Sequence, residues 1–343
     1  MMIKPTLATE YAAVRDGSAG VIDLSARGRL LISGSEAVMF LNGLITNDMK
    51  TLAVNSWMPA VFPNVQGRLL AAVRIIHRED GFLIDTESAT LATVLKLLER
   101  FTLAGDFHVA DLTSETAMLS IQGMNSDEVI LKTLGETVIN RHGVVIAQLG
   151  NGAKVTIIRA THTAEDGFDL FISANESGSL HDSLTRAGAQ PVGAEALEVL
   201  RVEAGIPRFG LDMDETNVVT ETNLDEAVSF TKGCYIGQEI IARIKYRGHV
   251  AKKLTGLTFE NEVALESGAQ IFSADDKEIG RVTSLTFSPR LKRTIALGYV
   301  KYDYLEPGTN VSVVYTGEKL PATVAALPFI HGSWYSDLAP SGA

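Results

Sequence analysis

Two segments of this chain repeat the order strand, Asp-Gly turn, strand, helix, and this repeat restricts the possible folds more than any other feature. The first copy has its turn at residues 80–81 and a helical pattern from Ser88, and the second has its turn at residues 166–167 and a helical pattern at residues 176–187. Asp-Gly turns join antiparallel strands into hairpins. The repeat therefore predicts two related α+β lobes with helices on antiparallel sheets. Because Asp-Gly hairpins are common, two unrelated hairpins are the alternative.

The last third of the chain has a different pattern. Short apolar segments separated by Gly, Pro, Asp and Asn lie at residues 254–259, 270–272, 281–287, 295–300 and 311–315. This spacing is typical of a small β-barrel or a sandwich. We therefore assign residues 1–248 to the two lobes and residues 249–330 to a C-terminal β-barrel domain. Residues 331–343 form a tail that is expected to fray.

Composition narrows the class of protein. The 343 residues are 46% hydrophobic with a net charge of −11, which suits a globular protein of two or three domains and disfavours nucleic-acid binding. No apolar run reaches the roughly 18–20 residues of a membrane helix, and the N-terminus lacks an apolar signal core, so we expect a cytoplasmic protein with no membrane partner. The single cysteine, Cys234, excludes an intrachain disulfide and an all-cysteine metal site. We expect no metal ligands.

The octapeptide K-G-C-Y-I-G-Q-E at residues 232–239 surrounds that cysteine. Gly237 and the apolar spacing that follows it predict a tight turn and then a helix, so Cys234 is expected just before a helix N-terminus. The partial positive charge of a helix start and the charge of Lys232 both favour a thiolate. We therefore predict an accessible, reactive thiol. The alternative is that Cys234 is a small packing residue, as most free cysteines are.

The octapeptide, together with N-L-D at residues 223–225 and S-F-T at residues 229–231, resembles the signature of the YgfZ family. These are folate-binding proteins of iron–sulfur cluster assembly and repair, related to the glycine-cleavage T-protein, an aminomethyltransferase. R-V-E-A-G-I-P at residues 201–207 and A-E-D-G-F at residues 164–168 extend the resemblance over most of the chain. The resemblance implies a three-lobed T-protein-like fold around a central hole, with tetrahydrofolate or a derivative bound in the hole.

Candidate folate contacts follow from the chemistry of this ligand. A carboxylate can hydrogen-bond the amino-pyrimidinone edge of the pterin, so Glu165 and Glu203 are the candidates. The structural alternative for Glu165 is a turn residue beside Asp-Gly, and for Glu203 it is a helix-end ion pair with Arg201. Phe62 and Tyr235 are candidates for the walls of the pocket, although packing in a core is the other use of an aromatic side chain. Arg247 represents the basic segment that could meet the anionic glutamate tail of folate.

One departure from the T-protein pattern bears on the reaction. T-proteins carry G-G-x-x-D-D after the first turn, and the first aspartate of this motif handles the folate nitrogen during aminomethyl transfer. The corresponding run here ends in Ala71 and Ala72. Alanine has no titratable group, so this difference argues against aminomethyl transfer.

The leading interpretation is a folate-dependent accessory protein for assembly or repair of iron–sulfur proteins, a role linked to tRNA modification, and not a classical enzyme. Cys234 and Lys232 would supply its chemistry, and its partners would be the iron–sulfur assembly machinery or client proteins. The alternative is a folate-dependent aminomethyl or one-carbon transferase resembling the T-protein. A thiol redox sensor without folate and a scaffold with a packed Cys234 also remain open.

Overall fold

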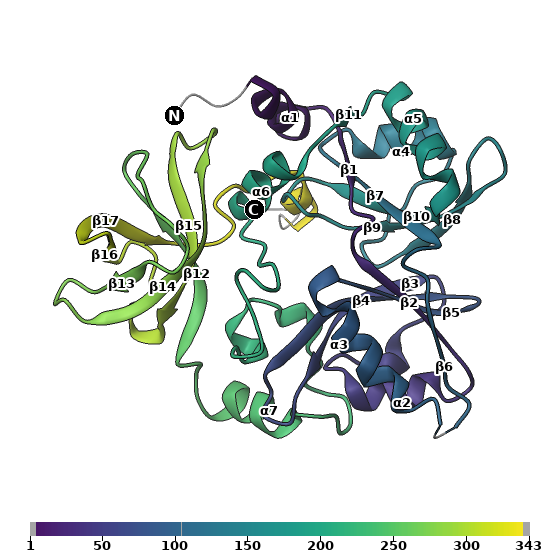
Figure 1. Ribbon diagram of the computed structural model, residues 1–343, viewed down its shortest axis with the longest axis horizontal. Helices are drawn as coiled ribbons and strands as arrows, with labels where there is room; N and C mark the ends of the chain where they lie inside the picture. Colours follow the sequence, from purple (N-terminus) through teal and green to yellow (C-terminus); the bar gives the residue numbers. More distant parts are fainter. Residues whose placement is uncertain (1–4, 104, 339–343) are drawn as a thin grey trace.

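The computed structural model describes residues 5–103 and 105–338 of the chain, with the side chains of Arg247, Asp337 and Leu338 excepted (Figure 1). It contains a five-stranded sheet, a six-stranded sheet and a closed six-stranded barrel. The two sheets stand one above the other on one side of the molecule, and the barrel lies on the opposite side (Figure 1). The predicted α+β fold with two lobes of largely antiparallel sheet and a C-terminal β-barrel is confirmed.

The five-stranded sheet forms the first lobe. Its strands run in the order β3 (Ser56–Pro63), β4 (Leu69–Arg78), β5 (Gly81–Thr86), β2 (Gly28–Ser33) and β6 (His108–Asp111), and every pair is antiparallel. Helices α2 (Ala37–Leu44) and α3 (Ser88–Glu99) bury their apolar side chains against this sheet in one core. Gly81 has φ of +135°, and a Cβ there would lie 2.3 Å from the Ile32 carbonyl oxygen, so the predicted Asp-Gly turn requires glycine.

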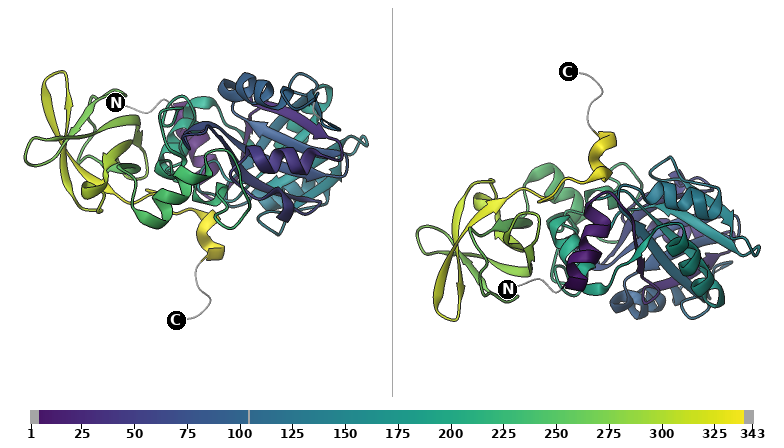
Figure 2. Two further views of the ribbon diagram at one scale, coloured as in Figure 1. Left: turned by 90° about the horizontal axis from the view of Figure 1, so that it is seen from below. Right: turned by 90° about the horizontal axis from the view of Figure 1, so that it is seen from above.

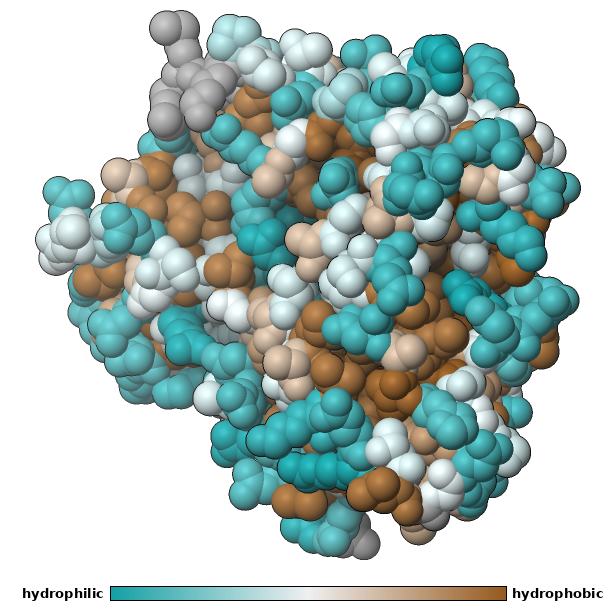
Figure 3. All heavy atoms as spheres, turned by 45° about the vertical axis from the view of Figure 1, so that its right-hand side comes forward, coloured by the Kyte–Doolittle hydropathy of each residue, from teal (hydrophilic) through white to brown (hydrophobic). Residues whose placement is uncertain are grey.

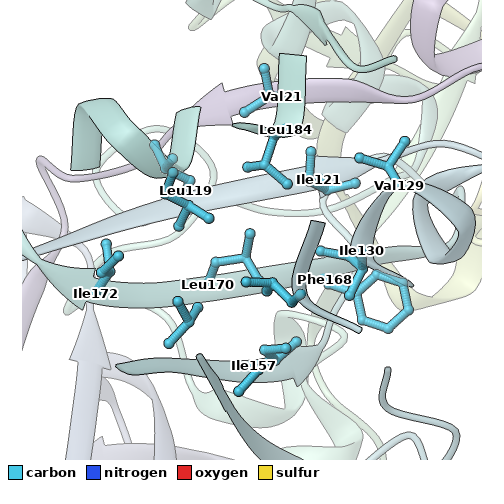
Figure 4. Packing of buried hydrophobic residues seen from close by; sticks show 14 of the residues in the cluster. Val21, Leu119, Ile121, Val129, Ile130, Ile157, Phe168, Leu170, Ile172 and Leu184 are labelled. Atoms are coloured by element: carbon cyan, nitrogen blue, oxygen red, sulfur yellow. The ribbon is translucent and has the colours of Figure 1, made fainter. Parts of the chain in front are cut away.

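The six-stranded sheet forms the second lobe. Its order is β11 (Gln190–Pro191), β1 (Gly20–Asp23), β7 (Thr116–Gln122), β10 (Gly167–Ser173), β9 (Lys154–Arg159) and β8 (Val144–Gln148). Helices α4 (Ser126–Leu134) and α5 (Ser177–Arg186) cover it, and residues such as Ile121, Leu170 and Leu184 meet in the core shown in Figure 4. The hairpin β9–β10 with α5 repeats the order of β4–β5 with α3, so the predicted repeat of two paired strands and a helix is present in both lobes. The Asp-Gly turn predicted for the second copy is wrong, because β9 and β10 are joined by the longer segment 160–166 and Gly167 is already the first residue of β10.

The lobes do not follow the order of the chain. Strand β1 pairs with β7 and, in parallel, with β11 of the second lobe, although the whole first lobe lies between β1 and β7 in the sequence. The two sheets also contact each other through a separate apolar cluster that includes Trp57, Ile76, Ile158 and Phe171. This cluster joins the lobes into one body.

The C-terminal domain is a closed barrel of strands β12 (Lys252–Thr258), β15 (Arg293–Lys301), β14 (Glu278–Ser288), β13 (Gln270–Phe272), β16 (Asn310–Tyr315) and β17 (Glu318–Ala325). Closure pairs β12 with both β15 and β17, which removes the free strand edges that a sandwich leaves. Its apolar interior includes Leu257, Ile271 and Val313. The barrel interpretation is therefore correct, and the sandwich alternative is not.

Several helices connect the three parts. Helix α1 (Pro5–Arg15) packs on α6 (Ala194–Glu203), and α6 packs in turn on β14 and β15 of the barrel. The remaining helices are α7 (Gln238–Arg247), η1 (Met49–Thr51), η2 (Ala174–Glu176), η3 (Val219–Glu221), η4 (Asp225–Ala227), η5 (Tyr302–Tyr304) and η6 (Ser333–Leu338). None of the helices within residues 5–103 and 105–338 is long and apolar enough to cross a membrane.

Of the expected tail at residues 331–343, residues 333–338 form helix η6, and residues 339–343 lie outside the described part of the chain. Helix η6 lies beside the junction of the lobes and the barrel (Figures 1 and 2), and the Ser333 backbone N–H and hydroxyl both donate to Glu165 at 2.8 Å. The face of the molecule in Figure 3 mixes apolar patches with hydrophilic borders, as is usual for a folded protein.

Candidate functional site

A cavity of about 660 Å³ lies where the two lobes and the barrel meet. Each part of the molecule contributes to its wall: Trp57 and Arg74 come from the first lobe, His162 from the second, and Leu254 from the barrel. Ligand sites for small molecules typically measure roughly 300–1,000 Å³ and form at such junctions. This cavity is therefore the candidate site, at the position that the resemblance predicted for a central hole.

Aromatic side chains form part of the cavity wall. Both tryptophans of the chain, Trp57 and Trp334, line it together with Tyr335. The Trp57 indole N–H donates to the Arg141 carbonyl oxygen at 3.0 Å, and the Arg141 guanidinium carbon lies 4.2 Å from the centre of the Trp334 ring. These contacts fix both indoles in place, so the cavity presents rigid, flat apolar surface to a ligand.

A row of buried charges runs along the wall between the lobes. Arg27 donates to both oxygens of Asp85 at 2.8 Å, and the Arg74 Nε donates to the same carboxylate at 2.8 Å. Arg74 also donates to Asp169 on β10 of the other lobe. Burial raises the pKa of the Asp169 carboxyl, but the interactions with His162 and Arg74 outweigh this effect, and its pKa lies well below the ordinary value.

His162 is the member of this row that contributes an imidazole to the cavity lining. Its Nε2 lies 3.1 and 3.0 Å from the two oxygens of Asp169, whose side chain is fully buried. A carboxylate can only accept, so Nε2 carries the proton. The His162 backbone N–H donates to the Gln122 side-chain oxygen at 2.9 Å, which anchors the loop.

Two exposed carboxylates, Asp225 and Glu226 on η4, line the same cavity. The Asp225 Oδ2 is 3.8 Å from the ammonium of Lys253. The preceding Asn223 has a positive φ of 60°, and its amide donates to the Leu254 carbonyl oxygen at 2.9 Å, so η4 is tied to the barrel. The wall therefore offers hydrogen-bond acceptors and a nearby cation to a polar ligand.

The structure places the two predicted pterin contacts, Glu165 and Glu203, away from the cavity wall. Arg15 lies between them, with its NH1 2.8 Å from the Glu165 Oε1 and its NH2 3.0 Å from the Glu203 Oε2. Tyr11 and Ser288 also donate to Glu203, and burial raises the pKa of this carboxyl against the opposing effect of Arg15. Their oxygens are engaged within the protein, and their role toward folate stays a prediction.

The suggested ion pair between Glu203 and Arg201 does not form. The Arg201 guanidinium instead bonds Glu198 and Asp212, and the Glu203 side chain turns toward Arg15 on α1. The sequence pattern gave no sign of this choice because Arg15 is far from Glu203 along the chain.

The other predicted pocket residues lie elsewhere. Phe62 is 1% exposed in the first-lobe core, and Tyr235 is 9% exposed in an apolar cluster beneath α7. Neither is in the cavity lining. Arg247 ends α7, and its side chain lies outside the described part of the chain. These assignments stay predictions.

Cys234 is exposed, as the sequence predicted, and α7 begins at Gln238 shortly after it. The Lys232 ammonium is buried instead and donates to the carbonyl oxygens of Asn42, Ile45 and Asn47 at 2.7, 3.0 and 2.6 Å, around the end of α2. Burial lowers its pKa to about 8. Lys232 therefore stabilises the end of a helix, and the predicted chemical role of Cys234 stays a prediction.

Sequence reasoning missed the residues that line the cavity most clearly. Trp57 and Trp334 are far apart in the chain, and only the fold brings them together. His162 could have been predicted from the sequence, because it lies three residues before Glu165, which was itself a candidate. The available signal was a histidine followed at residue 169 by an aspartate on a predicted strand.

Comparison with known proteins shows which protein family this chain resembles. The profile described as GCVT N-terminal domain matches residues 2–232, and the one described as glycine cleavage T-protein C-terminal barrel domain matches residues 252–331. The aminomethyltransferase of Geobacillus sp. (strain WCH70) is 30% identical over 329 residues, which cover 93% of this chain and 89% of the relative. The aminomethyltransferase of Aquifex aeolicus (strain VF5) is 31% identical over 322 residues, with 94% and 86% covered.

The fold has a solved counterpart as well. The crystal structure of glycine cleavage system aminomethyltransferase T from Bartonella henselae matches with a TM-score of 0.86 and 23% identity, over 96% of this chain and 91% of that one. At this identity the likeness concerns the fold alone.

Proposed function

We propose, because this chain belongs to the glycine cleavage T-protein family, that it is a tetrahydrofolate-dependent transferase of aminomethyl or related one-carbon groups. The proposal rests on one structural observation: a cavity of about 660 Å³ at the junction of all three parts of the molecule, with both tryptophans in its wall. The donor would carry its one-carbon group on a thiol carrier or a small amine.

This proposal corrects the leading interpretation of the sequence. An iron–sulfur accessory role was preferred, but relatives covering 93–94% of the chain are aminomethyltransferases at 30–31% identity, so that interpretation was wrong. Iron–sulfur partners and tRNA modification find no support among these relatives. The octapeptide at residues 232–239 supports only a placement in the YgfZ branch of the family, and a cytoplasmic location stays a prediction.

The cavity residues fit tetrahydrofolate. Trp334 and Tyr335 would cover the flat pterin, and the carboxylates of Asp225 and Glu226 would accept hydrogen bonds from its amino-pyrimidinone edge. Lys253, next to Asp225, would meet the anionic tail. Bound folate would supply the nitrogen that accepts the one-carbon unit. The protein would hold that nitrogen against the donor and exclude water.

Tryptophan fluorescence tests folate binding directly, because the only two indoles of the chain line the cavity. Titration with tetrahydrofolate should change the emission saturably, and at a hundredfold excess over Kd it should stabilise the fold by about 2.7 kcal/mol. Trp57→Phe and Trp334→Phe should each retain part of the signal. An unchanged emission and an unchanged Tm at saturating tetrahydrofolate would contradict folate binding.

Turnover is tested separately. Tetrahydrofolate and an S-aminomethyl dihydrolipoyl compound should give folate-dependent release of ammonia, followed against a reaction without protein. A protein that binds tetrahydrofolate but releases no ammonia from this donor or from small amine donors would contradict the transferase proposal while leaving folate binding in place.

A further inference from the structure

We propose that His162 is the proton-transfer residue of the cavity and that Asp169 is its positioning residue. This inference rests on the proposed one-carbon transfer and names the side chain that the reaction needs. Transfer of a carbon to a nitrogen that bears a proton requires a group within hydrogen-bond reach that takes up that proton.

The position where the T-protein resemblance expects a carboxylate cannot supply this group. Ala71 is fully buried on β4 opposite Phe62, and its neighbour Ala72 contributes only a methyl group to the cavity wall. The first lobe therefore presents no titratable group at this point of the wall, and the proton acceptor must come from another part of the lining.

Most other titratable side chains of the cavity lining are held in ion pairs or keep their proton, so they are not free to accept one. Arg27 and Arg74 are held in buried ion pairs, and Glu87 is bonded to Arg27. Burial raises the pKa of Tyr335, so this phenol keeps its proton at neutral pH. The lining carboxylates that remain, Asp225 and Glu226, are exposed to solvent on η4.

His162 is built as a proton acceptor. Its Nε2–H points at the buried Asp169, which leaves Nδ1 as the ring atom with a free lone pair. Within the described part of the chain, Nδ1 has no hydrogen-bond partner, and the side chain is 19% exposed in a residue that lines the cavity. A carboxylate behind an imidazole fixes its tautomer and stabilises the charged ring, so Asp169 sets up His162 for this role.

The proton balance is simple. His162 Nδ1 takes the proton that the folate nitrogen loses as it bonds to the methylene carbon. His162 then gives that proton to the carrier atom, which leaves with the electron pair of its broken bond to carbon. In this step one bond forms, one breaks, and no oxidant or reductant is involved. When the carrier is a thiol, ammonia would leave in a second step, in which the other folate nitrogen would bond to the same carbon, the bond from carbon to the amine would break, and the amine would take the proton that this nitrogen loses. Asp169 stays ionised throughout, because Arg74 also pairs with it.

The test compares His162→Gln with the wild type in tetrahydrofolate binding and in single-turnover transfer across pH. Glutamine keeps a hydrogen-bonding side chain beside Asp169, so the fold and folate binding should persist, with Kd changed less than about threefold. The rate of transfer should fall about 100-fold or more. The limb of the pH profile in the range where imidazoles titrate should disappear, and added imidazole should restore part of the rate in His162→Ala.

The matched control is His108→Gln. His108 also lies 3.0 Å from an aspartate, Asp106, but on the exposed edge strand β6 and outside the cavity lining. This variant should bind and transfer like the wild type. For Asp169→Asn, the ¹⁵N signals of the His162 ring should change from one tautomer to a mixture, and kcat should fall with little change in KM. This spectroscopic readout does not depend on turnover.

Two results overturn the inference in distinguishable ways. If the wild type transfers one-carbon units and His162→Gln does so at the same rate with the same pH profile, His162 is not the proton-transfer residue, while the proposed function stands. The same conclusion follows if Glu226→Gln alone removes the pH limb. If the wild type binds no tetrahydrofolate or transfers nothing, the proposed function and this inference fail together.

Discussion

At the scale of single residues, the buried ammonium of Lys232 links the octapeptide to the first lobe. It donates to three backbone carbonyls around the end of α2, where the helix dipole is negative. Burial nevertheless lowers its pKa to about 8 from 10.5. Between pH 8 and 10.5 the unfolded chain therefore binds more protons than the folded one, and this group makes the free energy of unfolding rise with pH.

Lys232→Met should remove this dependence. We expect the wild type to gain stability relative to the variant as pH rises from below 8 toward 10.5, because only the wild type loses a buried charge in that window. Urea unfolding at both ends of the window measures the difference. Lys96→Met, at an exposed position of α3, is the control and should follow the wild type. A constant difference between wild type and Lys232→Met at all pH values would contradict the prediction.

Cys234 gives a second prediction at this scale. Its side chain is exposed, so iodoacetamide should modify one thiol per chain in the native state, as mass spectrometry would show. Cys234→Ser should change the free energy of unfolding by no more than about 0.5 kcal/mol, as is usual for surface substitutions. A thiol that reacts only after denaturation would contradict the exposed position.

At the scale of elements, the turn before α7 rests on the turn between β3 and β4. Gly237 has φ of +77°, and a Cβ there would come within 2.4 Å of the Asn64 carbonyl oxygen. Gly237→Ala combines backbone strain with this overlap and should cost roughly 1–3 kcal/mol in the free energy of unfolding, measured by urea denaturation. Gly178→Ala in α5, where a Cβ meets nothing within 4 Å, should be neutral or stabilising. Equal effects of the two substitutions would show that the close approach is not needed.

The sequence predicted the individual strands and hairpins better than it predicted the candidate site. The hairpin at residues 80–81 and five of the six barrel strands follow from local periodicity and turn chemistry, which act over a few residues. The segment 160–166 that joins β9 to β10 and the last barrel strand, β17, were not predicted. The candidate site follows from tertiary contacts. The Glu203 side chain is buried because it pairs with Arg15 on α1. Trp334 lines the cavity because the chain returns from the barrel to the lobes. No local sequence pattern predicts these contacts between residues that are far apart in the chain.

At the scale of the whole molecule, Arg15 joins α1, the second lobe and α6 through Glu165 and Glu203. Arg15→Met would leave two buried carboxylates without their cation and should lower the free energy of unfolding by about 3–5 kcal/mol. The loss should shrink at low pH, because burial raises the pKa of Glu203 and its protonated form needs no cation.

Chemical denaturation at neutral and acidic pH measures both effects of this substitution. Arg243→Met is the matched control, since its ion pair with Glu239 is exposed and should contribute less than about 1 kcal/mol. An Arg15→Met variant as stable as this control at neutral pH would show that the buried cluster of Arg15, Glu165 and Glu203 does not hold α1, the second lobe and α6 together.

The position of β1 has a consequence for how this chain is made and how it can be divided. All five strands of the first lobe lie between β1 and β7 in the sequence, so that lobe is an insertion within the second. During synthesis, residues 20–21 leave the ribosome long before residues 190–191, their parallel partners, exist. Strand β1 of the second lobe therefore stays unpaired while the inserted first lobe is synthesised. The assembly of the second lobe depends on contacts between residues of high sequence separation. A gene fragment can encode the first lobe alone, but every uninterrupted fragment that encodes the second also encodes the first.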